Sequence, residues 1–265
     1  MGLGENINYI ATNWNDYRKF CRKEVRTKPP QIWEVKKSNH DLIRNLKKFS
    51  KSLEQNIDQN IYKVKWSVGE GRLNQSPWVA IMDKKITTTP RSGYYVAYLF
   101  TTDLKKLYLC IALGVTQFDR LYRKTQDGLM KISEASKQVQ NMFEHLRPSD
   151  FSKNNIDLYL ENEEFIKKNE YTQWLTKGYQ NGTIYNLLPY DTSSKLSNEK
   201  IILDFKSAIN FYKEIEKDPL STQIKFIAES RYKFKKPKSS EVIIKDFDFG
   251  EIVVKESKNK KSKKP

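Results

Sequence analysis

The segment from residue 62 to residue 112 limits the possible folds most, because it reads as four apolar strands separated by polar turns. In residues 62–68 apolar and polar side chains alternate, as in a strand with one buried face. Residues 78–82 and 94–100 are almost continuously apolar, which is typical of strands covered on both sides. A fourth run, 107–112, follows a short polar connection. Because short connections join antiparallel neighbours, the pattern predicts an antiparallel or mixed sheet and not a doubly wound parallel one.

Helices are expected on both sides of this block, where apolar residues recur at helical spacing. The stripes are Leu42, Leu46, Phe49 and Leu53, then Ile132, Ala135, Val139, Met142 and Leu146, and finally Ile201, Phe205, Ile209, Tyr212 and Ile215. The last helix is predicted to start at Asn198 and to stop at Asp218, because a residue before proline is pushed out of helical geometry. The predicted fold is therefore α+β, a central mixed or antiparallel sheet flanked by helices.

Length and composition favour one main domain, since 265 residues with 38% hydrophobic side chains are enough for a sizeable core. We expect this domain over residues 1–217, followed by a basic tail or linker over 218–265 with a possible short hairpin and a disordered end. No run approaches membrane-spanning length and no secretory signal is visible. Cys21 and Cys110 are too few for a disulfide framework or a zinc site, so a reducing cytoplasm and no cofactor are expected.

The net charge of +16 is unevenly distributed. Residues 17–48 carry eleven Lys and Arg against three Asp and Glu, and residues 225–265 carry thirteen against six. The central block is almost balanced. Phosphate contacts supply affinity without sequence information, so basic segments on either side of a neutral site favour a nucleic acid partner. A lysine-rich surface that merely keeps the protein in solution is the alternative.

Three short motifs follow one another in the strand block: a Gly69-Glu70-Gly71 loop, Pro77-Trp78, and Gly93-Tyr94-Tyr95. Paired glycines permit a tight turn and let the backbone approach a ligand closely. Aromatic residues on strands belong to the core more often than to a pocket, so the residue types alone leave both interpretations open.

In this order the motifs resemble the N-terminal DNA-binding domain of McrB, the recognition part of restriction systems specific for modified cytosine. The similarity extends over roughly residues 15–217 and closes with Gly182-Thr183-Ile184-Tyr185, Leu188-Pro189 and the last helix. It implies a DNA-recognition module of a restriction or phage-defence system, with double-stranded DNA as its partner and no catalytic site of its own. Cleavage would then depend on a nuclease or GTPase partner subunit, or on a further C-terminal domain.

The resemblance also implies site residues. Trp78, Tyr95 and Leu99 match the pocket that encloses a flipped 5-methyl- or hydroxymethylcytosine. The loop that enters the DNA corresponds to Gly69, Glu70, Gly71, Arg72 and Leu73. In McrB an aromatic residue between the glycines fills the gap left by the base, whereas this chain has Glu70. Arg72 or Leu73 is therefore an alternative inserted side chain, and a different recognised base is a further alternative. Expected phosphate contacts are Lys36, Lys37, Arg44, Lys63 and Lys65.

Other interpretations remain at this point. The glycine loop lacks the third glycine of a dinucleotide fingerprint and the Gly-Lys-Ser/Thr of a phosphate-binding loop. A magnesium-dependent nuclease built from Asp16, Glu34 and Lys36 has the right residue types, because carboxylates hold the metal and lysine stabilises developing charge. A subunit that reads unmodified duplex DNA and a protein that binds single-stranded RNA are further alternatives.

Overall fold

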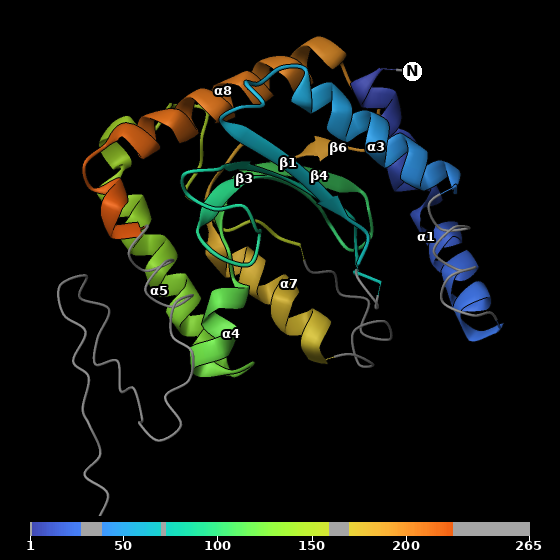
Figure 1. The fold of residues 1–265 in the computed structure, drawn as a ribbon, viewed down its shortest axis with the longest axis horizontal. Coiled ribbons are helices and arrows are strands. Elements are labelled where there is room, and N and C mark those ends of the chain that lie inside the picture. The colour runs from blue at the N-terminus through green and yellow to red at the C-terminus, as the bar shows by residue number, and fades with distance from the viewer. Residues whose placement is uncertain (1, 28–38, 70–72, 159–169, 225–265) are drawn as a thin grey trace, which may run out of the picture.

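The structure, a computed structural model, describes residues 2–27, 39–69, 73–158 and 170–224. Its centre is an antiparallel sheet in which four strands follow one another in chain order: β1 (Tyr62–Ser67), β2 (Trp78–Asp83), β3 (Tyr94–Phe100) and β4 (Lys106–Leu113). Two short strands, β5 (Thr183–Asn186) and β6 (Tyr190–Asp191), pair with β4 and complete the sheet. Helices surround it (Figure 1). The predicted α+β class is confirmed, and every strand pair within the described residues is antiparallel.

One face of the sheet is covered by α3 (Asp41–Glu54) and α8 (Asn198–Lys217), with α1 (Leu3–Thr27) packed against α3. Aromatic rings join these layers: Phe49 of α3 lies 5.2 Å from Tyr98 of β3, and Tyr94 lies 5.5 Å from Tyr212 of α8, between ring centroids. The Tyr212 hydroxyl also donates a 2.9 Å hydrogen bond to the Tyr94 carbonyl. This face is the larger hydrophobic core.

The opposite face carries a smaller hydrophobic cluster, in which several side chains are short. Ala80, Ala97, Cys110 and Ala112 lie in a second hydrophobic cluster with Ile156 and Leu158, which belong to the segment before α7 (Glu170–Gly182). Small residues leave room for that segment to approach the strands. Below the sheet in Figure 1, α7 and α4 (Thr116–Tyr122) cover part of this face.

A third group of elements lies beside β5. The helix α5 (Gln126–Met142) is followed by a 3-10 turn, η1 (Glu144–Leu146). Two buried polar side chains of α5 hold the strand: Ser136 donates to the Thr183 carbonyl at 2.7 Å, and Gln140 donates to the Ile184 carbonyl at 2.7 Å. Because these bonds satisfy buried polar groups, they fix the position of β5 at the edge of the sheet.

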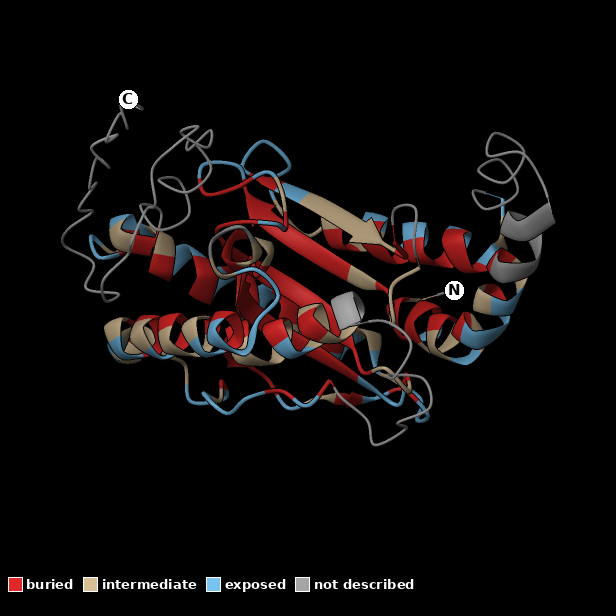
Figure 2. Cartoon of the chain, turned by 90° about the horizontal axis from the view of Figure 1, so that it is seen from below, coloured by how far each residue is buried: buried red, intermediate tan, exposed pale blue. Residues whose placement is uncertain are grey.

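The edge strand β1 shows the predicted alternation. Tyr62, Val64 and Trp66 contact the larger core, whereas Lys63 and Lys65 stand on the opposite face with Ser67. Figure 2 shows the central strands buried and β1 only partly so. The sheet therefore has one well-covered face and one whose β1 end is polar.

The predicted helices over the three apolar stripes are confirmed as α3, α5 and α8. The helix α8 starts at Asn198 as predicted, and Ser197 before it is the N-cap, since its hydroxyl accepts from the Lys200 amide at 3.2 Å. One detail differs: α5 ends at Met142, so that Leu146 falls in η1. Asp218 does end α8 as predicted. The expected tail hairpin lies outside the described residues. None of the helices in the described part of the chain is both long and apolar enough to cross a membrane.

Candidate functional site

A cavity of about 620 Å³ opens on the less covered face of the sheet, between the strands and α7. Its volume lies within the range of small-ligand pockets, roughly 300–1,000 Å³. Its lining residues come from β1, the β1–β2 loop, the ends of β2 and β3, the segment before β3, the start of α4, the segment before α7, and α7 itself. They are Lys65, Ser67, Leu73, Asn74, Gln75, Ser76, Pro77, Trp78, Pro90, Arg91, Leu99, Phe100, Thr116, Leu158, Leu175, Thr176 and Tyr179.

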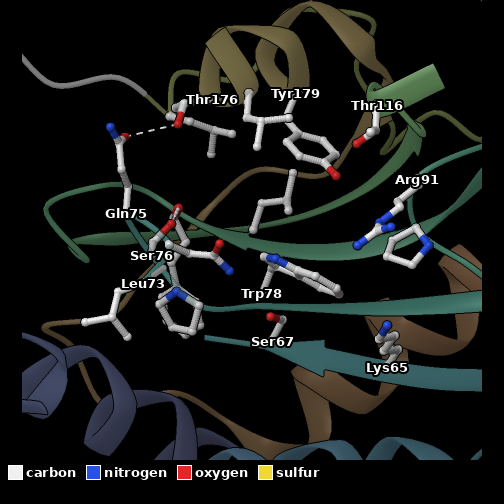
Figure 3. A pocket seen from close by; sticks show the side chains of 17 residues that line it. Lys65, Ser67, Leu73, Gln75, Ser76, Trp78, Arg91, Thr116, Thr176 and Tyr179 are labelled. Carbon is white, nitrogen blue, oxygen red and sulfur yellow. Dashed lines mark hydrogen bonds between the residues drawn. The ribbon is translucent and has the colours of Figure 1, made fainter. Parts of the chain in front are cut away.

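Trp78 is the aromatic residue that the sheet presents to this cavity. It is the first residue of β2, directly after the buried Pro77, and it pairs with Ser67 on one side and Leu99 on the other. Its side chain is half-buried, not enclosed in the core. Figure 3 shows the indole reaching into the cavity from the strands. A flat aromatic face in such a position is suited to stacking against a planar ligand.

Asn74 fixes the edge of that indole. In the amide orientation that satisfies its neighbours, its side-chain oxygen accepts from Trp78 Nε1 and from the Gly69 amide, both at 3.1 Å. The Asn74 backbone amide donates to the Val68 carbonyl at 2.9 Å. One residue therefore ties the tryptophan to the base of the glycine loop.

The glycine loop starts and ends at the cavity rim. Gly69 has a φ of 111°, a left-handed conformation that favours glycine, and its amide donates to Ser67 Oγ at 2.9 Å. Leu73, at the other end, lines the cavity. Glu70, Gly71 and Arg72 lie outside the described residues.

Leu99 and Tyr95 occupy different positions, although both face the same side of β3. Leu99 lines the cavity and is 7% exposed. Tyr95 is 1% exposed and lies behind the wall, where its hydroxyl donates to the Pro90 carbonyl at 2.8 Å. Four residues of strand advance the chain by about 13 Å, which carries Tyr95 past the cavity and under the segment before β3. The structure thus brings Trp78 and Leu99 together at the cavity but not Tyr95.

Tyr179 of α7 supplies the aromatic wall opposite the sheet. Its ring points from α7 toward the space occupied by the Trp78 side chain (Figure 3), and its hydroxyl lies 3.3 Å from that of Tyr95. Sequence reasoning missed this residue because α7 was not predicted. The signal available was Leu175, Thr176 and Tyr179, three residues at helical spacing that all face the cavity.

Gln75 connects the cavity rim to two helices. Its carbonyl accepts from Trp14 Nε1 of α1 at 2.8 Å, and its side-chain oxygen accepts from Thr176 Oγ1 of α7 at 3.0 Å. Ser76 next to it donates to the Phe100 carbonyl at 2.8 Å. These bonds hold the β1–β2 loop against the rest of the fold and so position Trp78.

Basic side chains adjoin the cavity on its sheet side. Lys65 and Arg91 line it, and the exposed Lys63 stands on the same face of β1. Arg44 is not near them: it lies on α3, on the other side of the sheet, and forms an ion pair with Asp41. The expected phosphate contacts Lys36 and Lys37 lie outside the described residues.

The residues of the alternative nuclease site are not brought together by any described contact. Asp16 is exposed on α1 and pairs with Lys19 at 3.1 Å, while Glu34 and Lys36 lie outside the described residues. Where the structure is described, no group of three or more His, Cys, Asp or Glu side chains is placed to hold a metal ion. His40 caps α3, and His145 contacts Asp218 at 3.1 Å.

Comparison with known proteins bears on this geometry. A family model described as MrcB-like, N-terminal domain matches residues 23–217, a span that contains the whole sheet, α7 and the cavity. Neither the curated proteins nor the solved structures yielded a match. Domains of this kind are DNA-binding modules of restriction systems, not catalytic domains. The match covers most of the sequence and confirms the resemblance drawn from its motifs, so the chain belongs to the family of MrcB-like N-terminal domains.

Proposed function

We propose that this chain recognises duplex DNA by rotating a modified cytosine, with a 5-methyl or 5-hydroxymethyl group, out of the helix and into the cavity beside Trp78. The observation that carries the proposal is the half-buried indole facing an open cavity of about 620 Å³ at the base of the glycine loop, in a domain of a DNA-binding family. Tyr179 and Leu99 complete the aromatic and apolar walls.

The energetics of base rotation support an aromatic cavity. Unpairing and unstacking a nucleotide costs a few kcal/mol, and stacking on an aromatic side chain returns about 1–3 kcal/mol per base. Trp78 offers such a surface, and its indole N–H is already bonded to Asn74, so the ring is held in place before a base enters. Leu99 gives an apolar neighbour for the 5-substituent.

The basic side chains around the cavity support binding of DNA phosphates on this face of the sheet. Lys63, Lys65 and Arg91 stand on the cavity side of the sheet, where the phosphates that flank a rotated base would lie. The glycine loop at the rim is the segment we propose to enter the gap left by the base. Catalysis is assigned to a partner, a nuclease or NTPase subunit or domain that this module would direct to its site.

A titration of matched duplexes tests the proposal. Duplexes that differ only in one 5-methylcytosine are titrated at moderate salt with the original protein, Trp78→Ala and Trp66→Ala. Trp66 is the matched control, because it is also half-buried and lies on the neighbouring strand but faces the larger core. We expect preference for the modified duplex, a loss of about ten-fold or more in its affinity in Trp78→Ala, and retained preference in Trp66→Ala.

Equal affinities of the original protein for the two duplexes would show that it does not recognise the modification. They would favour a subunit that reads unmodified sequence. A Trp78→Ala protein that still prefers the modified duplex would show that the cavity does not recognise the modified base. Tighter binding to single-stranded RNA, or magnesium-dependent cutting by this chain alone, would favour the two remaining alternatives.

A further inference from the structure

The Asn74 side chain stands between the stacking ring of the cavity and the start of the glycine loop. Trp78 Nε1 and the Gly69 amide nitrogen both lie 3.1 Å from the same atom of its amide group. An indole N–H and a backbone N–H can donate a hydrogen bond but cannot accept one. The atom that they share must therefore be the Asn74 oxygen, which is the only acceptor of that amide group.

This oxygen joins two parts of the site that have different roles in the proposed function. Trp78 is the first residue of β2 and offers its ring to the cavity. Gly69 begins the loop that we propose enters the DNA, in a left-handed conformation with a φ of 111°. Asn74 also closes this loop through its backbone, because its amide donates to the Val68 carbonyl at 2.9 Å. Both ends of the loop are thus held by hydrogen bonds of one residue.

The backbone that carries the Asn74 side chain is fixed by the core. The carbonyl of Gln75, the next residue, accepts from Nε1 of the fully buried Trp14 at 2.8 Å. The ring of Trp78 is only half-buried, so packing restricts its rotation less than it restricts that of a core side chain. A hydrogen bond from its N–H to a fixed acceptor holds the indole in the orientation that Figure 3 shows.

We propose that Asn74 is a positioning residue that acts through Trp78: its oxygen sets the orientation of the stacking ring and the geometry at the start of the glycine loop together. Base stacking and entry of the loop into the DNA are thereby linked through one acceptor. This inference rests on the proposed function, because it assumes that a base stacks on Trp78. It adds a residue on which recognition of the modified base depends, although its acceptor serves N–H groups of the protein itself.

The experiment measures the preference, which is the ratio of affinities for matched duplexes with and without one 5-methylcytosine, in two variants of similar shape. Asn74→Leu keeps a branched side chain but has no acceptor, so we expect the preference to fall about five-fold, the size of one net hydrogen bond. Asn74→Asp keeps an oxygen that can accept from both N–H groups, so it should retain the preference. Its negative charge should lower the affinity for both duplexes alike, because DNA phosphates repel it.

Asn8→Ala is the matched control for a general loss of stability. The Asn8 side chain also makes two hydrogen bonds, to the Thr192 and Ser194 carbonyls at 2.9 and 2.7 Å, and none of these three residues lines the cavity. We expect Asn8→Ala to lower the temperature of unfolding without a change in the preference. A merely structural role of Asn74 would give the same result in Asn74→Leu.

A double-mutant cycle tests whether Asn74 acts through the indole N–H or contacts the base itself. Trp78→Phe keeps an aromatic face for stacking but has no N–H to donate. If Asn74 acts through the indole, Asn74→Leu changes the preference of the Trp78→Phe protein by less than about two-fold, because the interaction that it removes is already absent. An equal loss in both backgrounds would mean that Asn74 contacts the base directly, and it would overturn the inference.

A preference that is unchanged in Asn74→Leu, or that Asn74→Asp loses as fully as Asn74→Leu does, would also overturn the inference. The proposed function stands in those cases if the original protein prefers the modified duplex and Trp78→Ala does not. If the original protein has no preference, the proposed function falls and this inference falls with it. Should Asn74→Leu not fold, as judged by thermal unfolding, Asn74→Ala takes its place. If Trp78→Phe retains no preference, the comparison of Asn74→Asp with Asn74→Leu decides the outcome.

Discussion

Trp78 owes its position to three immediate neighbours. Pro77 before it is buried, Asn74 accepts from its indole nitrogen at 3.1 Å, and Leu99 is its cross-strand partner. The indole is therefore oriented in the free protein. A ligand that stacks on a pre-oriented ring loses less conformational entropy on binding than one that must order it.

Gly114 is a second position near the cavity at which the local structure restricts the residue type. Its amide donates to the Gly93 carbonyl at 2.8 Å, and a Cβ at this position would lie 2.4 Å from the Ser92 backbone nitrogen. This close approach holds the segment that carries Pro90 and Arg91 into the cavity wall.

Replacement of Gly114 by alanine should therefore destabilise the fold by roughly 1–3 kcal/mol, because backbone must move to admit the methyl group. Gly178→Ala is the matched control: its Cβ would make ordinary contacts of 3.4–3.5 Å with Val115 and Ile132, and alanine within α7 should stabilise by up to about 1 kcal/mol. Urea unfolding measures both changes. Equal effects of the two substitutions on the free energy of unfolding would show that the close approach of Gly114 to Ser92 does not restrict the side chain at position 114.

At the scale of elements, α3 depends on an unusual N-cap. His40 Nδ1 accepts from the Leu42 amide at 3.2 Å, which requires that nitrogen to be unprotonated. The pKa of His40 is lowered, chiefly by burial and also by Arg44, while Asp41 acts in the opposite direction. Its ring lies 4.9 Å from those of Tyr17 and Phe20, between centroids.

A lowered folded-state pKa means that the unfolded chain takes up the proton first. The contribution of His40 to stability is present above its unfolded pKa and is lost as pH falls toward and through the folded one. We expect the free energy of unfolding to drop between about pH 7 and pH 5, with the cap itself worth about 1 kcal/mol. His40→Asn keeps an uncharged cap, so it should flatten this part of the stability curve, and an unaltered pH profile in His40→Asn would contradict the assignment.

The elements that could be predicted from the sequence are those with local apolar patterns. Strands β2 and β3 are nearly continuous apolar runs because both of their faces are covered, and β1 alternates because one face is polar. The apolar pattern of α7 is weaker, because glycines, Gly178 and Gly182, stand where the helix lies close to Val115. Without α7 neither Tyr179 nor the far wall of the cavity can be placed from the sequence. The assignment of Tyr95 to the pocket came from the resemblance and stays a prediction, although Tyr95 is not among the residues that line the cavity.

At the scale of the whole molecule, the two faces of the sheet have separate roles. The large aromatic core on one side holds α3 and α8, whereas the other side combines the cavity with basic side chains of β1 and the segment before β3. This separation predicts that overall affinity for DNA and preference for a modified base respond to different changes. Phosphate contacts determine the first and the cavity determines the second.

Salt titrations check this separation. Lys63→Ala removes one phosphate contact on the cavity face, so the slope of log affinity against log salt should become shallower by about 0.9 while the preference for the modified duplex stays the same. Arg44→Ala is the control, because Arg44 lies on α3 across the sheet and pairs with Asp41. If Arg44→Ala changes the slope and Lys63→Ala does not, the DNA lies on the other face.

Rotation of the base into the cavity can be observed directly with 2-aminopurine, a fluorescent base that stacking quenches, placed beside the modified cytosine in the duplex. Saturation with the original protein should raise its emission, because its stacking neighbour leaves the helix, and Trp78→Ala at saturation should raise it much less. Full binding of the modified duplex by the original protein with no rise in emission would contradict the account, since the cytosine would then still be stacked inside the duplex.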